Sequence, residues 1–408
     1  MAEEDGRLRK EVDRVLAGLE RGDRKLSALA RRVAERCVRE NLKTASKLGI
    51  YYDILVWESD LVREGIVDEA LEMLRPHLYT GTGEKEGATL LRLSPLGLED
   101  KILVRSDGTT VYTARDIAYQ LWKFGKTKRD LRFKLHSARP DGKKTYTSSP
   151  DGKIRISRRN VEKVINVVGA EQRYPQQVVS SALKLLGYER EYRNSYHLAY
   201  EHVRLPEARF SGRKGTWVGF SVDEVLEEAY ERAYRVVKEH APSEDERFWR
   251  RTAKLVAIGA VRYTLLATSS EKGIVFKWEE ALNLRKNSGP AIQYSHARAC
   301  SILRKARGVR KSVRRADLLN SKEEERLIKL LAKFPTVTKT VGETLQVHLL
   351  ASYASELAQA FNVFYEACPV LGAKPNELRE ARLALVDCAR IVLRNSLNLM
   401  GIPAPERM

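Results

Sequence analysis

The first quarter of the chain alternates between helix-like and strand-like spacing of its hydrophobic residues. Residues 5 to 48 are highly charged, and their apolar positions recur every three or four residues, which predicts an amphipathic helix. The apolar positions on that predicted face are Leu8, Val12, Val15, Leu16 and Leu19. The run YYDILVWES, residues 51 to 59, predicts a short strand, and residues 66 to about 74 predict a second helix that ends before Pro76.

The next stretch combines strands with turn signals. Residues 88 to 105 contain two strand-like runs, ATLLRL and KILVR, separated by a turn region. RSDGTTVYTARDIAYQLWKFGK, residues 105 to 126, predicts a Ser-Asp-Gly turn that leads into a helix. The basic residues 126 to 160 carry two Asp-Gly pairs and are interpreted as a long hairpin insertion.

The fold predicted for the rest is α/β followed by all-α. Residues 164 to 168 form an apolar run that stops at Gly169, and a helix is predicted from about Pro175 to Leu186, a unit typical of parallel sheets. From about residue 223 the spacing is helical to the end. The two clearest late helices carry their apolar faces at Leu350, Tyr353, Leu357, Phe361 and Phe364, and at Leu378, Ala381, Leu385, Cys388 and Val392.

Net charge is the feature of the composition that says most about the function of the chain. Lys and Arg number 73 against 54 Asp and Glu, a net charge of +19, which favours a polyanionic partner such as nucleic acid over a surface that is basic only for solubility. No apolar run is long enough to span a bilayer. Four scattered cysteines and seven dispersed histidines indicate neither a disulfide framework nor a zinc site, and a cytoplasmic protein is expected.

Two loops have the composition of phosphate or ligand sites. ARFSGRKGTW, residues 208 to 217, places Ser211, Arg213 and Lys214 among glycines, which suits a phosphate chain gaining negative charge, although a solvated basic loop fits equally well. Gly169 and Gln172 follow a predicted strand, where open α/β sheets bind ligands, or else form an ordinary strand-to-helix turn.

Two helical segments carry further candidate chemistry. Tyr112 and Asp116 lie four residues apart and share a helix face, where a carboxylate could bind a guanidinium, unless Asp116 merely favours the helix start. Residues 288 to 317 suit RNA, or form a charged helix face. They interleave Tyr294 with Arg298, Arg304, Lys305, Arg307, Arg310, Lys311, Arg314 and Arg315.

Taken in order, these segments resemble one family over almost the whole chain. YYDILVWESD, RSDGTTVYTARDIAYQLWKF, FSGRKGT, NSGPAIQYSHARACSILRKA and ARLALVDCARIVLRNSLNLMGIPAPERM are similar to arginyl-tRNA synthetases of archaeal type. The resemblance implies the second half of a class I nucleotide-binding, Rossmann-like catalytic domain and a helical-bundle anticodon-binding domain. The domains expected are a helical connecting segment (1–48), the catalytic part (49–222), a helical connection (223–285) and the anticodon-binding domain (286–408).

The resemblance also implies an activity and its residues. The expected reaction joins arginine to its tRNA with ATP, as the Mg²⁺ complex, and needs no structural metal. The expected arginine contacts are Tyr112, Asp116 and Gln172, with Gly169 beside ATP, and the expected catalytic loop residues are Ser211, Arg213 and Lys214. The positions expected to contact the anticodon loop are Tyr294, Arg298, Phe361, Tyr365 and Met408.

Departures from the family pattern suggest a partner. The His-Ile-Gly-His-like signature of class I enzymes and the family's N-terminal tRNA-elbow domain have no counterpart in these 408 residues. Half a doubly wound sheet leaves an uncovered edge and apolar face. We therefore expect an N-terminal synthetase segment that carries the histidine signature, without which the chain would be inactive. The alternative is a non-catalytic, truncated paralogue that binds tRNA or a synthetase.

Overall fold

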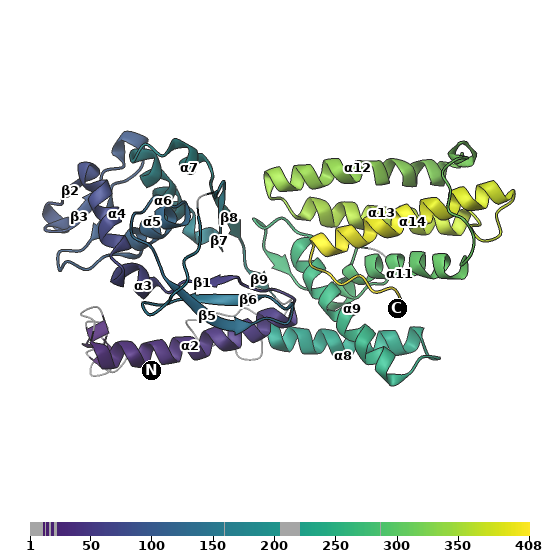
Figure 1. The fold of residues 1–408 in the computed structure, drawn as a ribbon, viewed down its shortest axis with the longest axis horizontal. Helices are drawn as coiled ribbons and strands as arrows, with labels where there is room; N and C mark the ends of the chain where they lie inside the picture. Colours follow the sequence, from purple (N-terminus) through teal and green to yellow (C-terminus); the bar gives the residue numbers. More distant parts are fainter. Residues whose placement is uncertain are drawn as a thin grey trace. The chain divides into compact units, whose positions relative to one another are not determined.

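The computed structural model describes residues 11–408 except 13, 16, 17, 20–22, 159, 205–220 and 286. Two compact units make up the chain, one from Met1 to Ala199 and one from Tyr200 to Met408, and each is described by itself (Figure 1). Among the described residues, no helix is both long and apolar enough to cross a membrane.

The first unit begins with a long helix that packs only half-buried side chains on one side. α2 (Arg24–Lys47) starts after Asp23, whose carboxylate accepts a hydrogen bond from the Leu26 amide at 2.9 Å, and none of its residues is buried. The predicted helix over residues 5 to 48 is thus partly right. Residues 11, 12, 14, 15, 18 and 19 are helical, while α2 has its own capped start at Asp23, whose amide donates to the Gly18 carbonyl.

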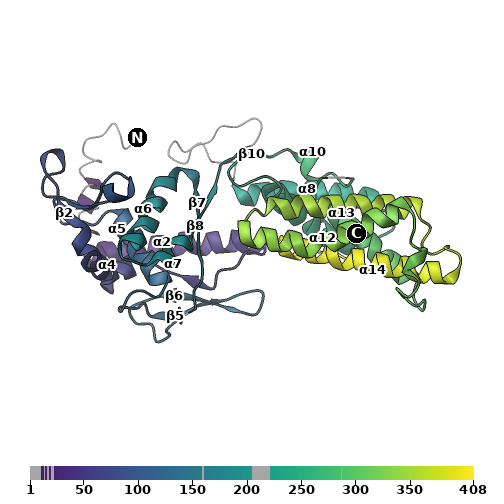
Figure 2. The same cartoon turned by 90° about the horizontal axis from the view of Figure 1, so that it is seen from above.

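A three-stranded sheet lies beside α2. Its order is β1 (Ile54–Leu55), β6 (Lys144–Ser148) and β5 (Phe133–Ala138), with β1 and β6 parallel and β5 and β6 antiparallel. The predicted hairpin is confirmed in β5 and β6 (Figure 2), but it is no separate insertion, because β6 pairs with β1. The predicted strand over 51–59 is too long, since only Ile54 and Leu55 pair and a helix begins at Glu58.

The remaining elements of the first unit surround its core. The two strands predicted within residues 88 to 105 are confirmed, and they form an antiparallel sheet with a third strand, Leu78–Thr80. The strand Val164–Gly169 pairs with Ser195–Tyr200. The helices pack Ile66, Ile117 and Val178 into one fully buried cluster. The elements are α3 (Glu58–Arg63), α4 (Ile66–Leu74), β2 (Leu78–Thr80), β3 (Thr89–Leu91), β4 (Lys101–Val104), α5 (Tyr112–Lys123), β7 (Val164–Gly169), α6 (Arg173–Leu185), α7 (Glu189–Arg193) and β8 (Ser195–Tyr200).

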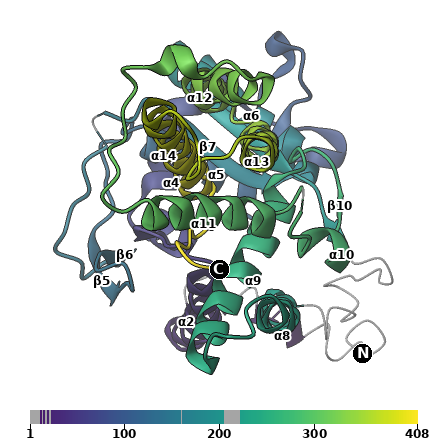
Figure 3. The same cartoon turned by 90° about the vertical axis from the view of Figure 1, so that its right-hand side faces the viewer.

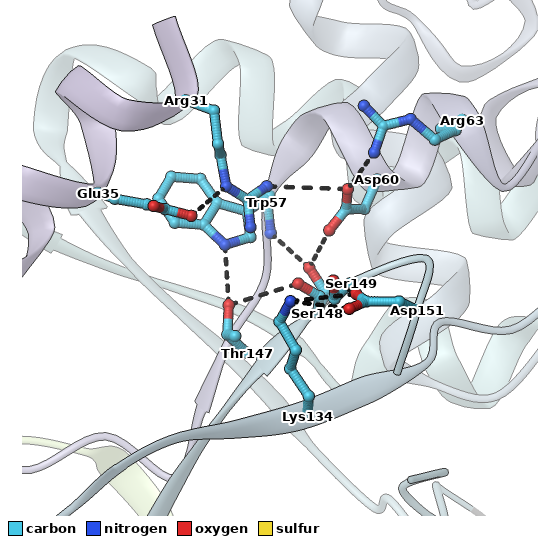
Figure 4. A network of polar contacts seen from close by, with 10 residues as sticks. All are labelled: Arg31, Glu35, Trp57, Asp60, Arg63, Lys134, Thr147, Ser148, Ser149 and Asp151. Atoms are coloured by element: carbon cyan, nitrogen blue, oxygen red, sulfur yellow. Dashed lines mark hydrogen bonds and ion pairs between the residues drawn. The ribbon is translucent and has the colours of Figure 1, made fainter. Parts of the chain in front are cut away.

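A buried carboxylate joins α2, α3 and β6 (Figure 4). Asp60 is 1% exposed, and it accepts hydrogen bonds from the Ser148 hydroxyl at 2.6 Å and the Arg63 guanidinium at 3.1 Å. Arg31 of α2 lies 3.9 Å from Asp60 and 3.9 Å above the Trp57 ring, whose indole nitrogen donates to Thr147. The network therefore attaches a solvent-exposed helix to the edge of the packed unit.

Within its described residues, the second unit is helical apart from one short parallel pair, β9 (Val203–Arg204) and β10 (Ile274–Val275). Helix α8 (Val222–His240) starts with a reciprocal cap between Ser221 and Glu224. The helices after it are α9 (Glu246–Leu266), α10 (Trp278–Ala281), α11 (Gly289–Lys305), α12 (Lys322–Thr344), α13 (His348–Ala367) and α14 (Asn376–Leu399). All of them except the short α10 contribute to one continuous apolar core, and α11 lies between α9 and the helices α13 and α14 (Figure 3).

We predict that Asp60→Ala destabilises the first unit by about 1–3 kcal/mol, because the buried Ser148 hydroxyl loses its acceptor. Urea unfolding followed by fluorescence checks this. Glu72→Gln removes a carboxylate from an exposed pair with Arg75 and should change stability by about 0.5 kcal/mol or less. Equal midpoints for the two variants would show that the Asp60 network does not stabilise the unit.

Candidate functional site

The helix that carries the first candidate pair is positioned by a tight turn. Gly108 adopts a left-handed φ of 83°, and the Asp107 carboxylate accepts from the Thr109 amide at 2.9 Å and its hydroxyl at 2.7 Å. α5 then buries Ile117 and Leu121 in the core. The polar residues on the other side of α5 are thereby fixed in position beside strand β7.

A cavity of about 310 Å³ lies where α5, β7 and α6 meet. Its polar lining forms a hydrogen-bonded set: the Lys123 ammonium donates to the Asn166 side chain at 2.8 Å, and the Asn166 amide donates to Gln176 at 2.8 Å and Gln120 at 3.2 Å. The cavity is lined by Asp116, Tyr119, Gln120, Lys123, Ile165, Asn166, Val167, Val168, Gln176 and Val179.

The two charged residues that line the cavity, Asp116 and Lys123, differ in their interaction partners. Loss of hydration by burial, together with the Glu58 carboxylate, raises the pKa of Asp116, and the Lys123 ammonium opposes this. Burial lowers the pKa of Lys123 from 10.5 to about 8, which the charge of Asp116 partly offsets. Although Asp116 is exposed at the cavity mouth, it makes no ion pair with any described residue. The cavity thus presents a carboxylate that has no ion-pair partner among the described residues.

The other predicted residues of this region lie apart from the cavity lining. Tyr112, the first residue of α5, is 73% exposed, with the Arg115 guanidinium 5.8 Å from its ring. Gln172 is exposed in the turn before α6, and Gly169 is buried at the end of β7. The structure therefore brings only Asp116 of the predicted arginine contacts into the cavity.

Sequence reasoning missed the other polar residues that line the cavity, which are Tyr119, Gln120, Lys123, Asn166 and Gln176. Lys123 lies seven residues after Asp116, which is two helical turns, so its position on the same face could have been found from spacing. Asn166 interrupts the apolar run of β7, and Gln176 lies one turn into α6. The predicted loop residues Ser211, Arg213 and Lys214 fall in 205–220, outside the described residues.

In the second unit, the predicted RNA contacts gather around one arginine. The Arg298 guanidinium lies 4.8 Å from the Tyr294 ring and 5.1 Å from the Tyr365 ring, and it donates to the Asn362 side chain at 2.8 Å. Tyr365 is exposed. Phe361 is fully buried, so its contribution to any RNA site would be to hold α13 in place. The cluster presents a cation between two aromatic rings.

The chain end is held against the same helices. Gln293 of α11 donates to the Pro403 carbonyl at 2.9 Å, and His296 donates to the Pro405 carbonyl at 2.9 Å. Arg407 pairs with Glu244, and the next residue, Met408, is half-buried. The last residues are thus fixed by contacts with α11 and with Glu244.

The basic segment after α11 is exposed, and two of its charges are paired. Lys311 pairs with Asp387 at 2.6 Å and Arg315 with Asp317 at 2.8 Å. Among the residues that the structure describes, no group of His, Cys, Asp and Glu side chains could hold a metal ion. All four cysteines are free thiols.

Comparisons with known proteins identify the class of both units. Residues 131–278 match the family of catalytic domains of class I tRNA synthetases (R), and residues 292–408 match the DALR anticodon binding domain. The fold is therefore part of a class I aminoacyl-tRNA synthetase catalytic domain, with parallel strands, followed by a helical anticodon-binding domain, as predicted.

The relatives narrow the class to one family. The arginine–tRNA ligase of Thermococcus sibiricus is 48% identical over the whole chain, and that of Thermus thermophilus is 40% identical over 98% of the chain and 67% of its own length. The solved Thermus thermophilus arginyl-tRNA synthetase superposes with a TM-score of 0.87 at 37% identity, over all of this chain and 68% of that one. The chain belongs to the arginyl-tRNA synthetase family.

The match covers only part of these relatives. The chain spans 65% of the length of the Thermococcus sibiricus relative. The arginyl-tRNA synthetase of Plasmodium falciparum, at 21% identity and a TM-score of 0.74, supports the fold alone.

We predict that Lys123 titrates near pH 8 and that Asp116→Asn lowers this midpoint, because the carboxylate stabilises the ammonium. Competitive acetylation of amines across neutral to alkaline pH, read by mass spectrometry, checks both midpoints. Since the pKa of folded Lys123 lies below 10.5, loss of its proton also favours folding between these pH values. Glu72→Gln serves as the control, and a midpoint that Asp116→Asn leaves in place would exclude the coupling.

Proposed function

We propose that the chain supplies the arginine-binding part of the catalytic domain and the anticodon-binding domain of an arginine–tRNA ligase. The enzyme would join arginine to its tRNA and convert ATP, bound with Mg²⁺, to AMP and pyrophosphate. The observation that carries the proposal is the unpaired Asp116 carboxylate at a cavity of about 310 Å³. Family membership supports the reaction class.

The chemistry of the cavity suits the side chain of arginine. A guanidinium offers a planar fork of donors that a carboxylate accepts in pairs, so Asp116 would hold it in one orientation. Arginine stays protonated at every working pH, so its charge would keep Asp116 ionised despite the raised pKa of that carboxyl. Tyr112 and Gln172 would close over the ligand after moving toward Asp116, since neither lines the cavity here.

The ATP side of the reaction would be shared. Gly169 ends the strand β7 and would border the nucleotide, while Ser211, Arg213 and Lys214 would stabilise the phosphates as the adenylate forms. The side chains of Ile165 and Val167 on β7 are 41% and 62% exposed next to the cavity. We propose that a synthetase segment outside these 408 residues, in the same or another polypeptide, covers them and supplies the histidine signature.

For tRNA, the Arg298 cluster is the proposed anticodon-loop contact. Tyr294 and Tyr365 flank the guanidinium, an arrangement on which unstacked bases can stack. The match of residues 292–408 to an anticodon-binding domain supports this role. Met408, fixed near α11 through the contacts of the final residues, is proposed as an additional contact, and the exposed basic residues 304–315 as contacts to phosphates.

We predict that Asp116→Asn raises the arginine concentration needed for half-maximal arginylation, by a factor that corresponds to on the order of 2–5 kcal/mol of binding free energy, because the guanidinium would face a neutral amide. The assay is arginine-dependent tRNA arginylation by the full chain, supplemented with a separately made synthetase segment that carries the histidine signature. Glu72→Gln is the control. An unchanged arginine requirement would remove Asp116 from the pocket, and normal arginylation without the added segment would show that no such segment is needed.

We predict that Arg298→Ala weakens binding of an anticodon stem-loop of an arginine tRNA by about 1–3 kcal/mol, through lost stacking and one lost cation. Fluorescence anisotropy with the full chain measures this. Arg326→Ala removes an exposed arginine of α12 and should leave the affinity unchanged. If the unaltered chain binds the stem-loop but the supplemented chain forms no arginyl-tRNA, the non-catalytic tRNA-binding alternative holds.

A further inference from the structure

Lys123 reaches back along α5 toward the proposed arginine contact. Its ammonium lies 4.2 Å from the centre of the Tyr119 ring, one helical turn nearer the start of α5, so the side chain runs toward the first turns of the helix. Asp116 lies two turns before Lys123, and both side chains line the cavity of about 310 Å³. The ammonium and the carboxylate therefore act on the same ligand space, although these two described residues form no ion pair with each other.

The ammonium is held in place by a neutral partner. Lys123 donates to the Asn166 side chain of β7 at 2.8 Å, and the Asn166 amide donates in turn to Gln176 at 2.8 Å and Gln120 at 3.2 Å. An uncharged amine keeps N–H donors, so it can make the same hydrogen bond to Asn166 after losing a proton. Loss of the proton therefore breaks no hydrogen bond in the cavity.

The charge that keeps Lys123 protonated comes from Asp116. The other titratable residue in the cavity lining is Tyr119, and burial raises the pKa of its phenol above the usual value, so it stays neutral. α3 contributes Glu58, which acts on Asp116 and is itself ion-paired. β7 and α6 contribute only uncharged side chains to the lining, and His197 of β8 donates to a main-chain carbonyl of β7 at 3.0 Å.

A cation bound at Asp116 would remove this support. Burial lowers the pKa of Lys123 to about 8, and the charge of Asp116 opposes that lowering. A guanidinium would neutralise the carboxylate and bring a second positive charge into the same cavity, and a nearby like charge disfavours the charged form of a titratable group. Loss of the Lys123 proton relieves this repulsion, whereas a ligand with an uncharged side chain creates no such repulsion.

We infer that Lys123 is a specificity-determining residue that loses its proton when arginine binds, and that its protonation sets how strongly the pocket prefers a guanidinium over an uncharged isostere. As the ammonium it opposes the bound guanidinium, and as the amine it leaves the charge of Asp116 to the ligand alone. Because the ammonium predominates below about pH 8 and the amine above it, the preference for arginine rises with pH through this range. The inference rests on the proposed function, because it takes Asp116 as the contact of the guanidinium.

Calorimetric titration with arginine and with citrulline, its uncharged isostere, tests the inference. The protein is the full chain supplemented with the synthetase segment that carries the histidine signature. Titrations at about pH 7.5 in two buffers of different ionisation enthalpy count the protons, and arginine should release about half a proton more than citrulline, for a lowering of about one pH unit in the Lys123 midpoint. The ratio of arginine affinity to citrulline affinity should rise about fivefold or more between about pH 6.5 and 9.

Variants of the lysine show whether Lys123 is the source of these effects. Lys123→Met should abolish both the extra proton release and the rise of the ratio with pH. Lys123→Arg stays charged throughout this range, so the ratio should remain at its low-pH value. Lys85→Met replaces an exposed lysine outside the cavity and should behave like the unaltered chain. The proton count needs no substitution, so it decides the matter even if a variant fails to fold.

Three results would overturn the inference: equal proton release with the two ligands, proton uptake with arginine, or a rise of the ratio with pH that persists in Lys123→Met. Uptake would mean that Lys123 binds the carboxylate of the ligand instead. Asp116→Asn separates the inference from the proposed function, because it should remove the arginine preference at every pH. A preference that survives Asp116→Asn would contradict both, whereas its loss combined with equal proton release would contradict the inference alone.

Discussion

The buried carboxylate of Asp60 is the constraint on which the arrangement of the first unit depends. Removing such a group from water is costly, and the cost is offset only where donors reach it from several sides. Here those donors come from α2, α3 and β6, which are more than eighty residues apart in the chain at their extremes. Satisfying one side chain therefore fixes where a peripheral helix and a central strand meet the core.

The carboxylate in the cavity beside α5 has fewer partners than Asp60 has. Asp60 is fully surrounded by its partners, whereas Asp116 has a raised pKa and makes no ion pair among the described residues. Lys123, the other charge of the cavity, already donates to Asn166 and lies 4.2 Å from the Tyr119 ring. The lysine is satisfied internally while the carboxylate has no ion-pair partner among the described residues, and this difference is why we propose Asp116 as the group that binds the ligand.

The sequence predicted local elements well and pairings poorly. The helix over residues 66 to 74 and the strand ending at Gly169 match α4 and β7, because apolar spacing and turn residues are local signals. The parallel pairing of β1 with β6 joins residues about ninety positions apart, which no local pattern encodes. Likewise, spacing placed Tyr112 and Asp116 on one helix face, but only the fold shows that Asp116 alone of the two lines a cavity, that Asn166 and Gln176 line it too, and that Phe361 is buried.

The lack of buried residues in α2 has a consequence for its motion. A helix with no fully buried residue exposes only its half-buried side chains, such as Val38 and Leu42, when it detaches, so its opening free energy is expected to be lower than the stability of the whole unit. The cation over Trp57 and the ion pair at Asp60 then contribute much of what holds α2 in place. Local opening of α2 would leave the core, and the cavity beside α5, intact.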